Sequence, residues 1–351
     1  MAKIVRYGVI GGGAIAQRRH LPEIHQNPDS QVVAIADPVA ERVKSLGACY
    51  DAKPFRDYKK MLADESLKLD AVVVAGPNKL HAPMTIDAHK AGCHVLCEKP
   101  MATNRADAKK MISAAAKAKK YLMIGMNQRL MPPHAKGREV MEAGKLGKPL
   151  TFETTFKHPG PDGWSIDGAT SWFFKKDPAQ MGVCGDLGIH KADLMRFLLG
   201  EEIVRVGGSI KTLDKKTPEG KLIPVDDNAF LVLETESGCI GTMTISWTNY
   251  GGFEDSGTTI YCENGVLRLG QDPEFGVMVD YADGQKERHI VGEVATNEKQ
   301  VSSGIADMLT ESILTRRTPA IDGLEGYKAM NVIVTAFEAA KSGKMTAVRK
   351  S

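Results

Sequence analysis

Hydrophobic residues in the first third of the chain fall into short runs that alternate with longer amphipathic stretches. The runs at 70–75 and 94–97 are largely apolar, which is typical of buried parallel strands. Strands are predicted at residues 4–10, 31–37, 70–75, 94–97 and 121–125. Helices are predicted at residues 14–25, 39–46, 58–63, 80–91 and 105–119, the last with Thr103 or Asn104 as its N-cap. This alternation favours right-handed crossover units and a parallel sheet.

The pattern changes after Pro132 and Pro133. A helix that ends at Gly144 is followed by closely spaced strand-like runs, with hairpin turns at Ser237-Gly238 and Asn264-Gly265. Strands are predicted at residues 151–157, 204–213, 229–235, 239–248, 258–262 and 276–281, and helices at 189–199, 301–315 and 324–341. We expect an α/β domain with a doubly wound parallel sheet at 1–128. An α+β domain with a large, open, mostly antiparallel sheet is expected at 129–351, and its C-terminal helix can pack back on the first domain.

Composition narrows the class of protein. The 351 residues include 46 Lys and Arg against 43 Asp and Glu, a net charge of +3, and no basic run exceeds two consecutive residues. This balance argues against a nucleic-acid partner and a polybasic membrane anchor, and the apolar runs are too short to span a bilayer. We expect a cytoplasmic globular protein without a signal segment.

The six cysteines show no CxxC spacing, and most lie in or beside apolar runs. This favours buried thiols in a reducing compartment. One cluster, Cys93, His94 and Cys97, looks like a set of metal ligands. On a strand, however, alternate side chains point to opposite faces, which scatters such ligands. No metal site is predicted.

The first predicted strand ends in a glycine-rich turn, Gly11-Gly12-Gly13-Ala14-Ile15-Ala16, that satisfies G-x-G-x-x-A. The motif is weak alone. With a strand before it and a helix after it, its glycines let a pyrophosphate approach backbone N–H groups at a helix N-terminus. The sequence therefore predicts a dinucleotide-binding Rossmann domain.

Asp37 ends the second predicted strand, about 20 residues beyond the glycine motif. An acid at this interval accepts a hydrogen bond from the ribose 2′-hydroxyl and repels a 2′-phosphate, so NAD is favoured over NADP. The alternative is that Asp37 caps the helix that follows, and the two roles can coexist. Arg42, one turn further along, could soften the preference by turning toward a phosphate.

Two further loops are expected around the nicotinamide end of the cofactor, because ligands of an open α/β sheet bind beyond the carboxyl ends of its strands. They are Gly76-Pro77-Asn78-Lys79-Leu80-His81 and Glu98-Lys99-Pro100. Lys99 can donate to a substrate hydroxyl and stabilise the developing alkoxide. The alternative is an ordinary surface pair of Glu98 and Lys99.

A second candidate for chemistry lies at the start of the helix predicted at 189–199. Asp186 and His190 are four residues apart, so within one helix they share a face, and the carboxylate can fix the imidazole tautomer and raise its basicity. The alternative is a capping Asp beside a half-buried His. Because of Gly188, the residue at which this helix begins is not determined by the sequence.

In order and spacing, the chain resembles the glucose-fructose oxidoreductase, inositol dehydrogenase and rhizopine catabolism (Gfo/Idh/MocA) family over nearly its whole length. The shared motifs are Gly8-Val9-Ile10-Gly11-Gly12-Gly13-Ala14-Ile15-Ala16, Ala36-Asp37-Pro38, Pro77-Asn78-Lys79-Leu80-His81, Glu98-Lys99-Pro100, Gly144-Lys145-Leu146-Gly147-Lys148-Pro149, Asp186-Leu187-Gly188-Ile189-His190 and Glu263-Asn264-Gly265. The resemblance implies a nucleotide-binding domain followed by an open-faced sheet domain. It also implies hydride transfer between a nicotinamide and a sugar or cyclic-polyol carbon, with a catalytic trio at Lys99, Asp186 and His190.

The chain departs from the family pattern at two places. The glycine-rich run before Asp186 is reduced to Met181-Gly182-Val183-Cys184-Gly185. Phe173 follows Trp172 where relatives often carry an Arg. The approach of the backbone to substrate and the support of the far side of the nicotinamide are therefore expected to differ.

These observations give two sets of candidate binding residues. For the cofactor they are Gly11, Gly13, Ala14, Ile15, Ala16, Asp37, Arg42, Gly76, Pro77, Asn78, His81, Glu98, Lys99 and Asn127. For the substrate they are Lys99, Arg129, His158, Asp162, Trp164, Trp172, Asp186 and His190. Polar and aromatic side chains suit a sugar, which presents hydroxyls and apolar ring faces, and the turn-rich segment 158–164 supplies three of them. Any one of these three can instead be a turn or packing residue.

The expected mechanism assigns proton removal to His190, a hydrogen bond to the same oxygen to Lys99, and either orientation of His190 or binding of a neighbouring hydroxyl to Asp186. One alternative is an enzyme that cycles a tightly held NAD, either between two sugars or through elimination and rehydration of a glycoside. Another is an NAD-binding sensor without chemistry, because fold does not fix function.

The alternating strand at 239–247 also predicts a homo-oligomer, either a dimer or a tetramer.

Overall fold

The computed structural model describes residues 3–251, 254–292 and 302–350. Contacts divide these residues into two units. The first unit holds the described residues of 1–127, 164–166 and 296–327, and the second holds those of 128–163, 167–295 and 328–351. The chain therefore passes between the units several times.

The first unit is built on a parallel sheet of six strands in the order β3-β2-β1-β4-β5-β6. Its strands are β1 (Val5–Ile10), β2 (Ser30–Ala36), β3 (Lys53–Phe55), β4 (Ala71–Val74), β5 (His94–Cys97) and β6 (Leu122–Ile124). The strand order reverses between β1 and β4, which is where a doubly wound sheet opens a crevice for a ligand. The predicted Rossmann fold is confirmed. Strand β3 was not predicted, because a three-residue edge strand containing Pro54 shows no alternation.

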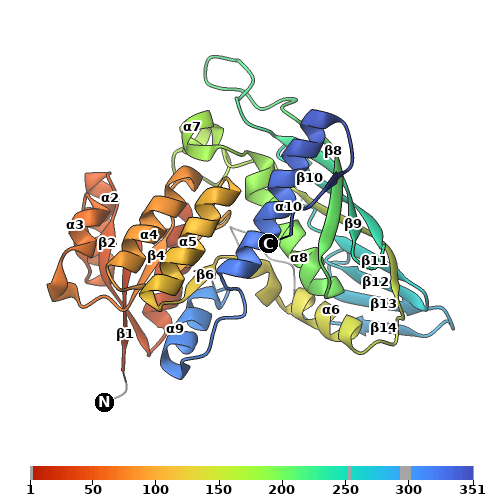
Figure 1. The fold of residues 1–351 in the computed structure, drawn as a ribbon, viewed down its shortest axis with the longest axis horizontal. Coiled ribbons are helices and arrows are strands. Elements are labelled where there is room, and N and C mark those ends of the chain that lie inside the picture. The colour runs from red at the N-terminus through yellow and green to blue at the C-terminus, as the bar shows by residue number, and fades with distance from the viewer. Residues whose placement is uncertain (1–2, 252–253, 293–301, 351) are drawn as a thin grey trace. The chain divides into compact units, whose positions relative to one another are not determined.

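Helices connect these strands. They are α2 (Ala40–Tyr50), α3 (Tyr58–Leu62), α4 (His81–Lys90) and α5 (Arg105–Ala118), with short 3₁₀ turns at Glu65–Leu67 and Asn78–Leu80. Helices α4 and α5 lie side by side (Figure 1). The single helix predicted at 14–25 is a π-helical turn, Ala16–His20, that continues into α1 (Leu21–Gln26). Asn104 caps α5 as predicted, because its side chain accepts the N–H of Asp107.

Helix α9 (Ile305–Thr315) joins the first unit from the far end of the sequence. Val301, the predicted start of this helix, lies outside the described residues. The hydroxyl groups of Tyr7 and Thr310 share a hydrogen bond of 2.8 Å. The carboxylate of Glu23 accepts the N–H of Ala306 at 3.1 Å. Both contacts are buried, so this late segment forms part of the core around β1 and α1.

The second unit is built on a sheet of nine strands in the order β14-β13-β12-β11-β7-β10-β9-β8-β15. Its strands are β7 (Pro149–Lys157), β8 (Ile203–Lys211), β9 (Asn228–Thr235), β10 (Ile240–Ser246), β11 (Thr258–Cys262), β12 (Gly265–Leu269), β13 (Val277–Tyr281), β14 (Lys286–His289) and β15 (Thr346–Ala347). Among the described strands of this second sheet, only the pairing of β10 with β7 is parallel, so the mostly antiparallel sheet is confirmed. Strands β12, β14 and β15 were not predicted.

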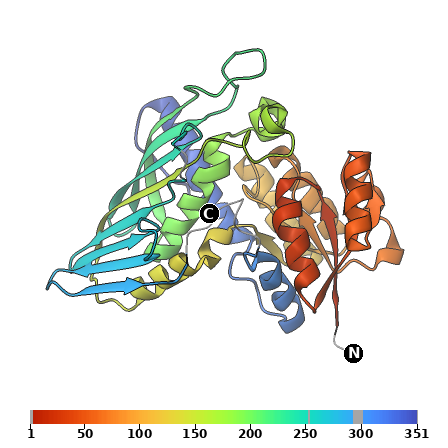
Figure 2. The same cartoon turned by 180° about the vertical axis from the view of Figure 1, so that it is seen from behind.

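Helices cover one face of this sheet. They are α6 (Pro132–Glu142), α8 (Ile189–Leu199) and the second-unit part of α10 (Gly323–Ser342). Short helical turns lie elsewhere along the chain, at Asn127–Leu130, Gly168–Thr170, Trp172–Phe174 and α7 (Lys176–Ala179). The close fit is visible at Gly188, where a Cβ would lie 2.5 Å from Ile245 of β10. The opposite face carries exposed side chains and no helix among the described residues, and Figure 2 shows its strands from behind.

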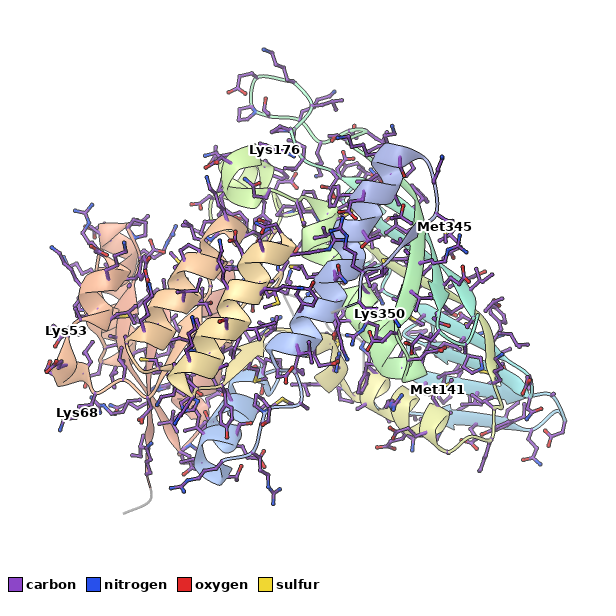
Figure 3. All side chains as sticks on the ribbon, in the orientation of Figure 1. Lys53, Lys68, Met141, Lys176, Met345 and Lys350 are labelled. Carbon is purple, nitrogen blue, oxygen red and sulfur yellow. The ribbon has the colours of Figure 1, made fainter. Side chains whose placement is uncertain are left out.

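Two features lie at the β8 end of the sheet. Met345, labelled in Figure 3, lies against Gly207 of β8, where a Cβ would be 2.4 Å from its sulfur. The chain between β8 and β9, residues 212–227, forms a long excursion that extends beyond these two strands (Figure 1).

Within the described ranges, no helix is long and apolar enough to cross a membrane.

Candidate active site

The glycine-rich turn packs tightly against the ends of two strands. Gly11 donates its N–H to the carbonyl of Ala36 at 2.8 Å and has φ +94°. A Cβ on Gly11 would lie 2.5 Å from the carbonyl oxygen of Ala75, so only glycine fits there. A Cβ on Gly13 would meet nothing within 4 Å. The turn is therefore closed at its first glycine and open at its third.

Asp37 binds this turn directly. Its carboxylate accepts the N–H of Gly12 at 2.9 Å through Oδ2 and the N–H of Val39 at 2.9 Å through Oδ1. The guanidinium of Arg42 lies 3.3 Å from Oδ2. Asp37 thus holds the glycine turn and the start of α2 at once, at the position where a ribose would meet an acid.

His81 joins the two loops that were predicted around the nicotinamide. Its Nδ1 lies 2.7 Å from the carbonyl oxygen of Pro100, and its Nε2 lies 2.8 Å from that of Gly76. Burial lowers the pKa of His81, although both backbone contacts favour the charged ring. The side chain of this predicted cofactor residue therefore fixes one loop to the other.

Glu98 lies in a buried cluster of charged groups behind Lys99. Its Oε1 accepts a hydrogen bond of 2.8 Å from His20 and lies 3.8 Å from Arg19, while its Oε2 accepts the backbone N–H of Lys99 at 3.1 Å. Burial alone would raise the pKa of Glu98. The hydrogen bond from His20 and the charges of His20, Arg19 and Lys99 outweigh burial and hold that pKa far below its usual range. Glu98 therefore anchors the backbone that presents Lys99.

Sequence reasoning missed Arg19 and His20. Both are buried, and they stand on the π-helical turn after the glycine motif. Their signal was present in the sequence as consecutive basic residues, Arg18-Arg19-His20, in the first helix after the glycine motif. Only the fold shows that two of them meet the carboxylate of Glu98.

In the second unit, Asp186 stands in a π-helical turn, Cys184–Gly188, that runs directly into α8, and His190 stands in the first turn of α8. The indole Nε1 of Trp247 donates to Oδ2 of Asp186 at 3.1 Å. Nε2 of His158 lies 3.8 Å from the same oxygen. The ring of Phe156 contacts both imidazoles, with centroid separations of 6.0 Å from His158 and 6.2 Å from His190.

Asp226 fixes the segment that leads into this turn. Its Oδ1 accepts the N–H of Gly182 at 2.7 Å, and its Oδ2 accepts the N–H of Cys184 at 2.8 Å. A Cβ on Gly182 would lie 1.9 Å from the carbonyl oxygen of Asp226. The shortened glycine run therefore keeps a glycine where the backbone of Asp226 approaches most closely. Sequence reasoning missed Asp226, because it lies about 40 residues from its partners.

Lys191, the residue after His190, is fully buried. Its ammonium donates to the carbonyl of Ser256 at 2.9 Å and lies 5.7 Å from the centre of the Phe156 ring. Burial lowers the pKa of Lys191 to about 7, and Asp255 and Glu254 only partly oppose this effect. A lysine beside the candidate base is thus held in an environment that disfavours its charge.

The other predicted substrate residues have identifiable partners. Arg129 forms a two-point ion pair with Asp193 at 2.7 and 2.6 Å. Asp162 accepts from Lys215 at 2.8 and 2.9 Å. Trp172 stacks on Phe173 with ring centroids 3.9 Å apart.

The predicted site residues are found in both units. The first unit contains the predicted cofactor residues, including Lys99 and Asn127, and also Trp164. The second contains Arg129, His158, Asp162, Trp172, Asp186 and His190. Among the described residues, no group of three or more His, Cys, Asp or Glu is arranged to hold a metal ion.

Comparison with protein families gives two matches along the chain. Residues 5–126 match the oxidoreductase family with an NAD-binding Rossmann fold, Gfo/Idh/MocA. Residues 134–268 match the Gfo/Idh/MocA C-terminal domain. The two matches follow the change from the parallel to the mostly antiparallel sheet.

Individual relatives match over most of their length. Myo-inositol 2-dehydrogenase of Thermotoga maritima is 27% identical over 334 residues, which cover 93% of each chain. Levoglucosan dehydrogenase of Pseudarthrobacter phenanthrenivorans is 27% identical over 315 residues, 80% of this chain and 77% of that one. The crystal structure of aldose-aldose oxidoreductase from Caulobacter crescentus, complexed with glycerol, has a TM-score of 0.82 at 26% identity and covers 98% of this chain and 100% of that one.

Proposed function

The chain belongs to the Gfo/Idh/MocA family of oxidoreductases, and from this premise we propose that it is an NAD-dependent dehydrogenase acting on a secondary alcohol of a cyclic polyol or sugar. The observation that carries the proposal is the placement of Asp186 and His190 on one continuous helical segment. The indole N–H of Trp247 donates a hydrogen bond to the carboxylate of Asp186. The names of the relatives, which act on inositol, levoglucosan and aldoses, support a ring-shaped polyhydroxy substrate.

The residues of the first unit fit NAD. Gly11 and Gly12 close the turn against the protein, while Gly13 leaves open space where a Cβ would stand, as a pyrophosphate beside backbone N–H groups requires. Asp37 supplies the acid for the ribose, which disfavours NADP. The residues that would hold NAD are Gly11, Gly13, Ala14, Ile15, Ala16, Asp37, Arg42, Gly76, Pro77, Asn78, His81, Glu98, Lys99 and Asn127. When bound, NAD supplies the acceptor for the substrate hydride.

The chain's own residues manage the proton and the oxygen. His190 takes the proton of the reacting hydroxyl, and Lys99 donates a hydrogen bond to the same oxygen as negative charge develops on it. Asp186 either orients His190 or binds a neighbouring hydroxyl. Because Trp247 donates to Oδ2 of Asp186, that carboxylate is fixed in orientation before any substrate binds.

The substrate ring is proposed to meet polar and aromatic side chains. His158 supports this role because it lies 3.8 Å from Asp186, and Trp172 supports it because its indole stacks on Phe173 in a short turn. Trp164 supplies another aromatic surface, and Arg129 and Asp162 add polar groups. In this proposal, residues 1–128 bind the cofactor and 129–351 bind the substrate.

We also propose a homo-oligomer, a dimer or tetramer, formed through the uncovered face of the nine-stranded sheet. Phe230 is 56% exposed, Ile240 50% and Val232 40%, and these side chains stand on the neighbouring strands β9 and β10. Apolar side chains gathered on an open sheet face favour a second protein surface. The proposal includes a cytoplasmic location, which the six free cysteines support.

A spectrophotometric screen tests the proposed function. Purified protein would be mixed with NAD or NADP and with myo-, scyllo- or chiro-inositol, glucose, xylose or related pyranoses, and the absorbance band of reduced nicotinamide recorded. We expect turnover with NAD on at least one ring polyol. His190→Ala and Lys99→Ala should each lower turnover by roughly 100-fold or more, because general-base and oxyanion contributions have this size.

Matched variants make the screen specific. His25→Ala and Lys90→Ala remove a histidine and a lysine that stand in the first unit away from the glycine turn and the Lys99 loop, and both should retain full activity. Retention of full activity in His190→Ala or Lys99→Ala would remove that residue from the mechanism. Failure of the wild type to reduce NAD with every ring polyol, while it still binds NAD, would overturn the proposed function.

A further inference from the structure

Lys215 stands in the excursion between β8 and β9, and Asp227 links the two sides of the base of that excursion. Asp227 donates its N–H to the carbonyl of Lys211 at 3.0 Å. Its carboxylate accepts the N–H groups of Leu213, Asp214 and Lys215 at 2.7, 2.8 and 2.8 Å. The backbone of Lys215 is therefore held from inside the unit, and its carbonyl accepts the N–H of Ile223 at 2.9 Å on the returning chain.

The side chain of Lys215 reaches a segment more than 50 residues earlier. Its ammonium donates to both carboxylate oxygens of Asp162, at 2.8 and 2.9 Å. It also lies 5.1 Å from the centre of the Tyr250 ring, and the hydroxyl of Tyr250 donates to Asp214 at 2.6 Å. Lys215 is only 6% exposed, so this ion pair is shielded from water on the lysine side.

The segment that Lys215 holds is the turn-rich loop 158–163. Gly160 of this loop has φ +109°, and a Cβ there would lie 2.8 Å from Cε of Lys215 and 2.8 Å from Oδ1 of Asp162. The lysine stem therefore packs directly on the loop backbone. Gly160 also donates its N–H to Nδ1 of His158 at 2.9 Å. Since Nδ1 accepts this bond, the neutral ring carries its proton on Nε2, the atom that lies 3.8 Å from Asp186.

We propose that the Lys215–Asp162 ion pair is a latch that strengthens substrate binding by holding loop 158–163, and with it His158, beside Asp186. Lys215 is a positioning residue, because it acts through Asp162 and the loop backbone. The inference rests on the proposed function, since it takes Asp186 and His158 as parts of the polyol site.

The physical consequence is a coupling between the excursion and the substrate pocket. Without the ammonium, the carboxylate of Asp162 loses its charged partner. The loop can then adopt more conformations, because its two prolines and Gly160 do not hold it in one conformation by themselves. Substrate must then order the loop when it binds, which weakens binding more than it slows the later steps. A change in Lys215 should therefore raise the KM for the polyol while kcat is largely preserved.

The test compares Lys215→Met, Asp162→Asn and the double variant with Lys221→Met. Lys221 is an exposed lysine of the same excursion, and its backbone carbonyl accepts the N–H of Thr217, a contact that the substitution keeps. We expect Lys215→Met and Asp162→Asn each to raise the polyol KM about tenfold with kcat changed less than about threefold. The double variant should be no worse than either single variant, because both remove the same interaction. Lys221→Met should match the wild type.

Amide hydrogen exchange gives a second measurement that does not depend on turnover. The amides of Gly160 and Gly163 report on the loop, and they should exchange faster in Lys215→Met and Asp162→Asn than in the wild type or Lys221→Met. Thermal unfolding and NAD binding check that each variant is folded. Unchanged exchange, an unchanged KM in Lys215→Met, or fully additive effects in the double variant would overturn the latch. If the wild type uses no ring polyol, the proposed function fails, and exchange alone still decides for or against the latch.

Discussion

The indole N–H of Trp247 donates a hydrogen bond of 3.1 Å to the carboxylate of Asp186. Trp247 directly follows strand β10 and lies 61 residues after Asp186 in the sequence. The same tryptophan donates its backbone N–H to the carbonyl of Asp227 at 2.8 Å, and Phe173 and Phe174 meet its ring edge to face. A carboxylate that belongs to the candidate active site is thus oriented by a fully buried side chain that has no freedom to turn away.

Trp247→Phe should lower kcat/KM for the polyol about tenfold or more, because it keeps an aromatic ring but removes a hydrogen bond to a charged group. Steady-state kinetics with NAD would measure the effect. Phe174→Leu is the control, since it removes an edge contact with Trp247 and keeps the donor. Equal losses in the two variants would show that packing, and not the hydrogen bond, is what matters.

Gly13→Ala should weaken NAD binding while the protein stays folded. A Cβ at Gly13 meets nothing in the protein, so its cost falls on the pyrophosphate that would approach there. Titration of NAD followed by fluorescence or calorimetry should show a Kd raised about tenfold or more, equivalent to about 1.4 kcal/mol. Gly11→Ala should differ, because its φ of +94° and the carbonyl of Ala75 at 2.5 Å make the folded protein itself unstable. An unchanged Kd in Gly13→Ala would contradict this placement of the pyrophosphate.

Glu98→Gln should destabilise the protein at neutral pH, and by progressively less as the pH falls below about 4.5. The pKa of Glu98 is lowered in the folded protein, so its stabilising effect is fully present above the unfolded value of 4.5 and is lost as the pH falls through the folded pKa. Loss of one partner of a buried ion cluster costs about 3–5 kcal/mol. Denaturant unfolding from pH 7 down to pH 3.5 should show the wild type and variant converging below about pH 4.5. Glu41→Gln, an exposed control, should follow the wild type throughout.

Lys191→Met should change the alkaline side of the stability profile. The pKa of Lys191 is lowered from 10.5 to about 7, so between these values the unfolded chain binds a proton that the folded protein does not. The unfolding free energy of the wild type should therefore rise from about pH 7 toward pH 10. Lys191→Met should lack this contribution. Parallel profiles for the two proteins, measured against Lys221→Met, would contradict the assignment of this rise to Lys191.

The order of the elements could be predicted from the sequence, but several edge strands of the sheets could not. The apolar runs at β4 and β5 and the cap at Asn104 are local signals, and the structure confirms them. Strand β14, Lys286–His289, consists entirely of polar residues at the edge of its sheet, so no alternation marks it. The helix predicted at 14–25 contains a π-helical turn, and Arg19 and His20 of this turn meet Glu98, a partner that lies far along the sequence.

The same distinction holds for the candidate site. Spacing was sufficient to select Asp186 and His190, because they stand four residues apart on one element. Trp247 and Asp226 were not predicted, because their partners lie tens of residues away in the sequence. Trp247 reaches Asp186 through one hydrogen bond, and Asp226 reaches Gly182 and Cys184 through two. Lys191 escaped because a lysine is ordinarily exposed, and only the packing of α8 on β7 places its ammonium beside Phe156.

Asp226 and Asp227 are adjacent, yet their carboxylates serve different segments: one holds Gly182 and Cys184 ahead of Asp186, and the other closes the excursion at Leu213, Asp214 and Lys215. The stretch between Lys216 and Val225 therefore runs into two adjacent acids, and only the first of them also binds the segment that leads into α8. A change of length within this stretch should therefore leave both carboxylates and their backbone contacts in place, so the excursion can vary without loosening the segment ahead of Asp186.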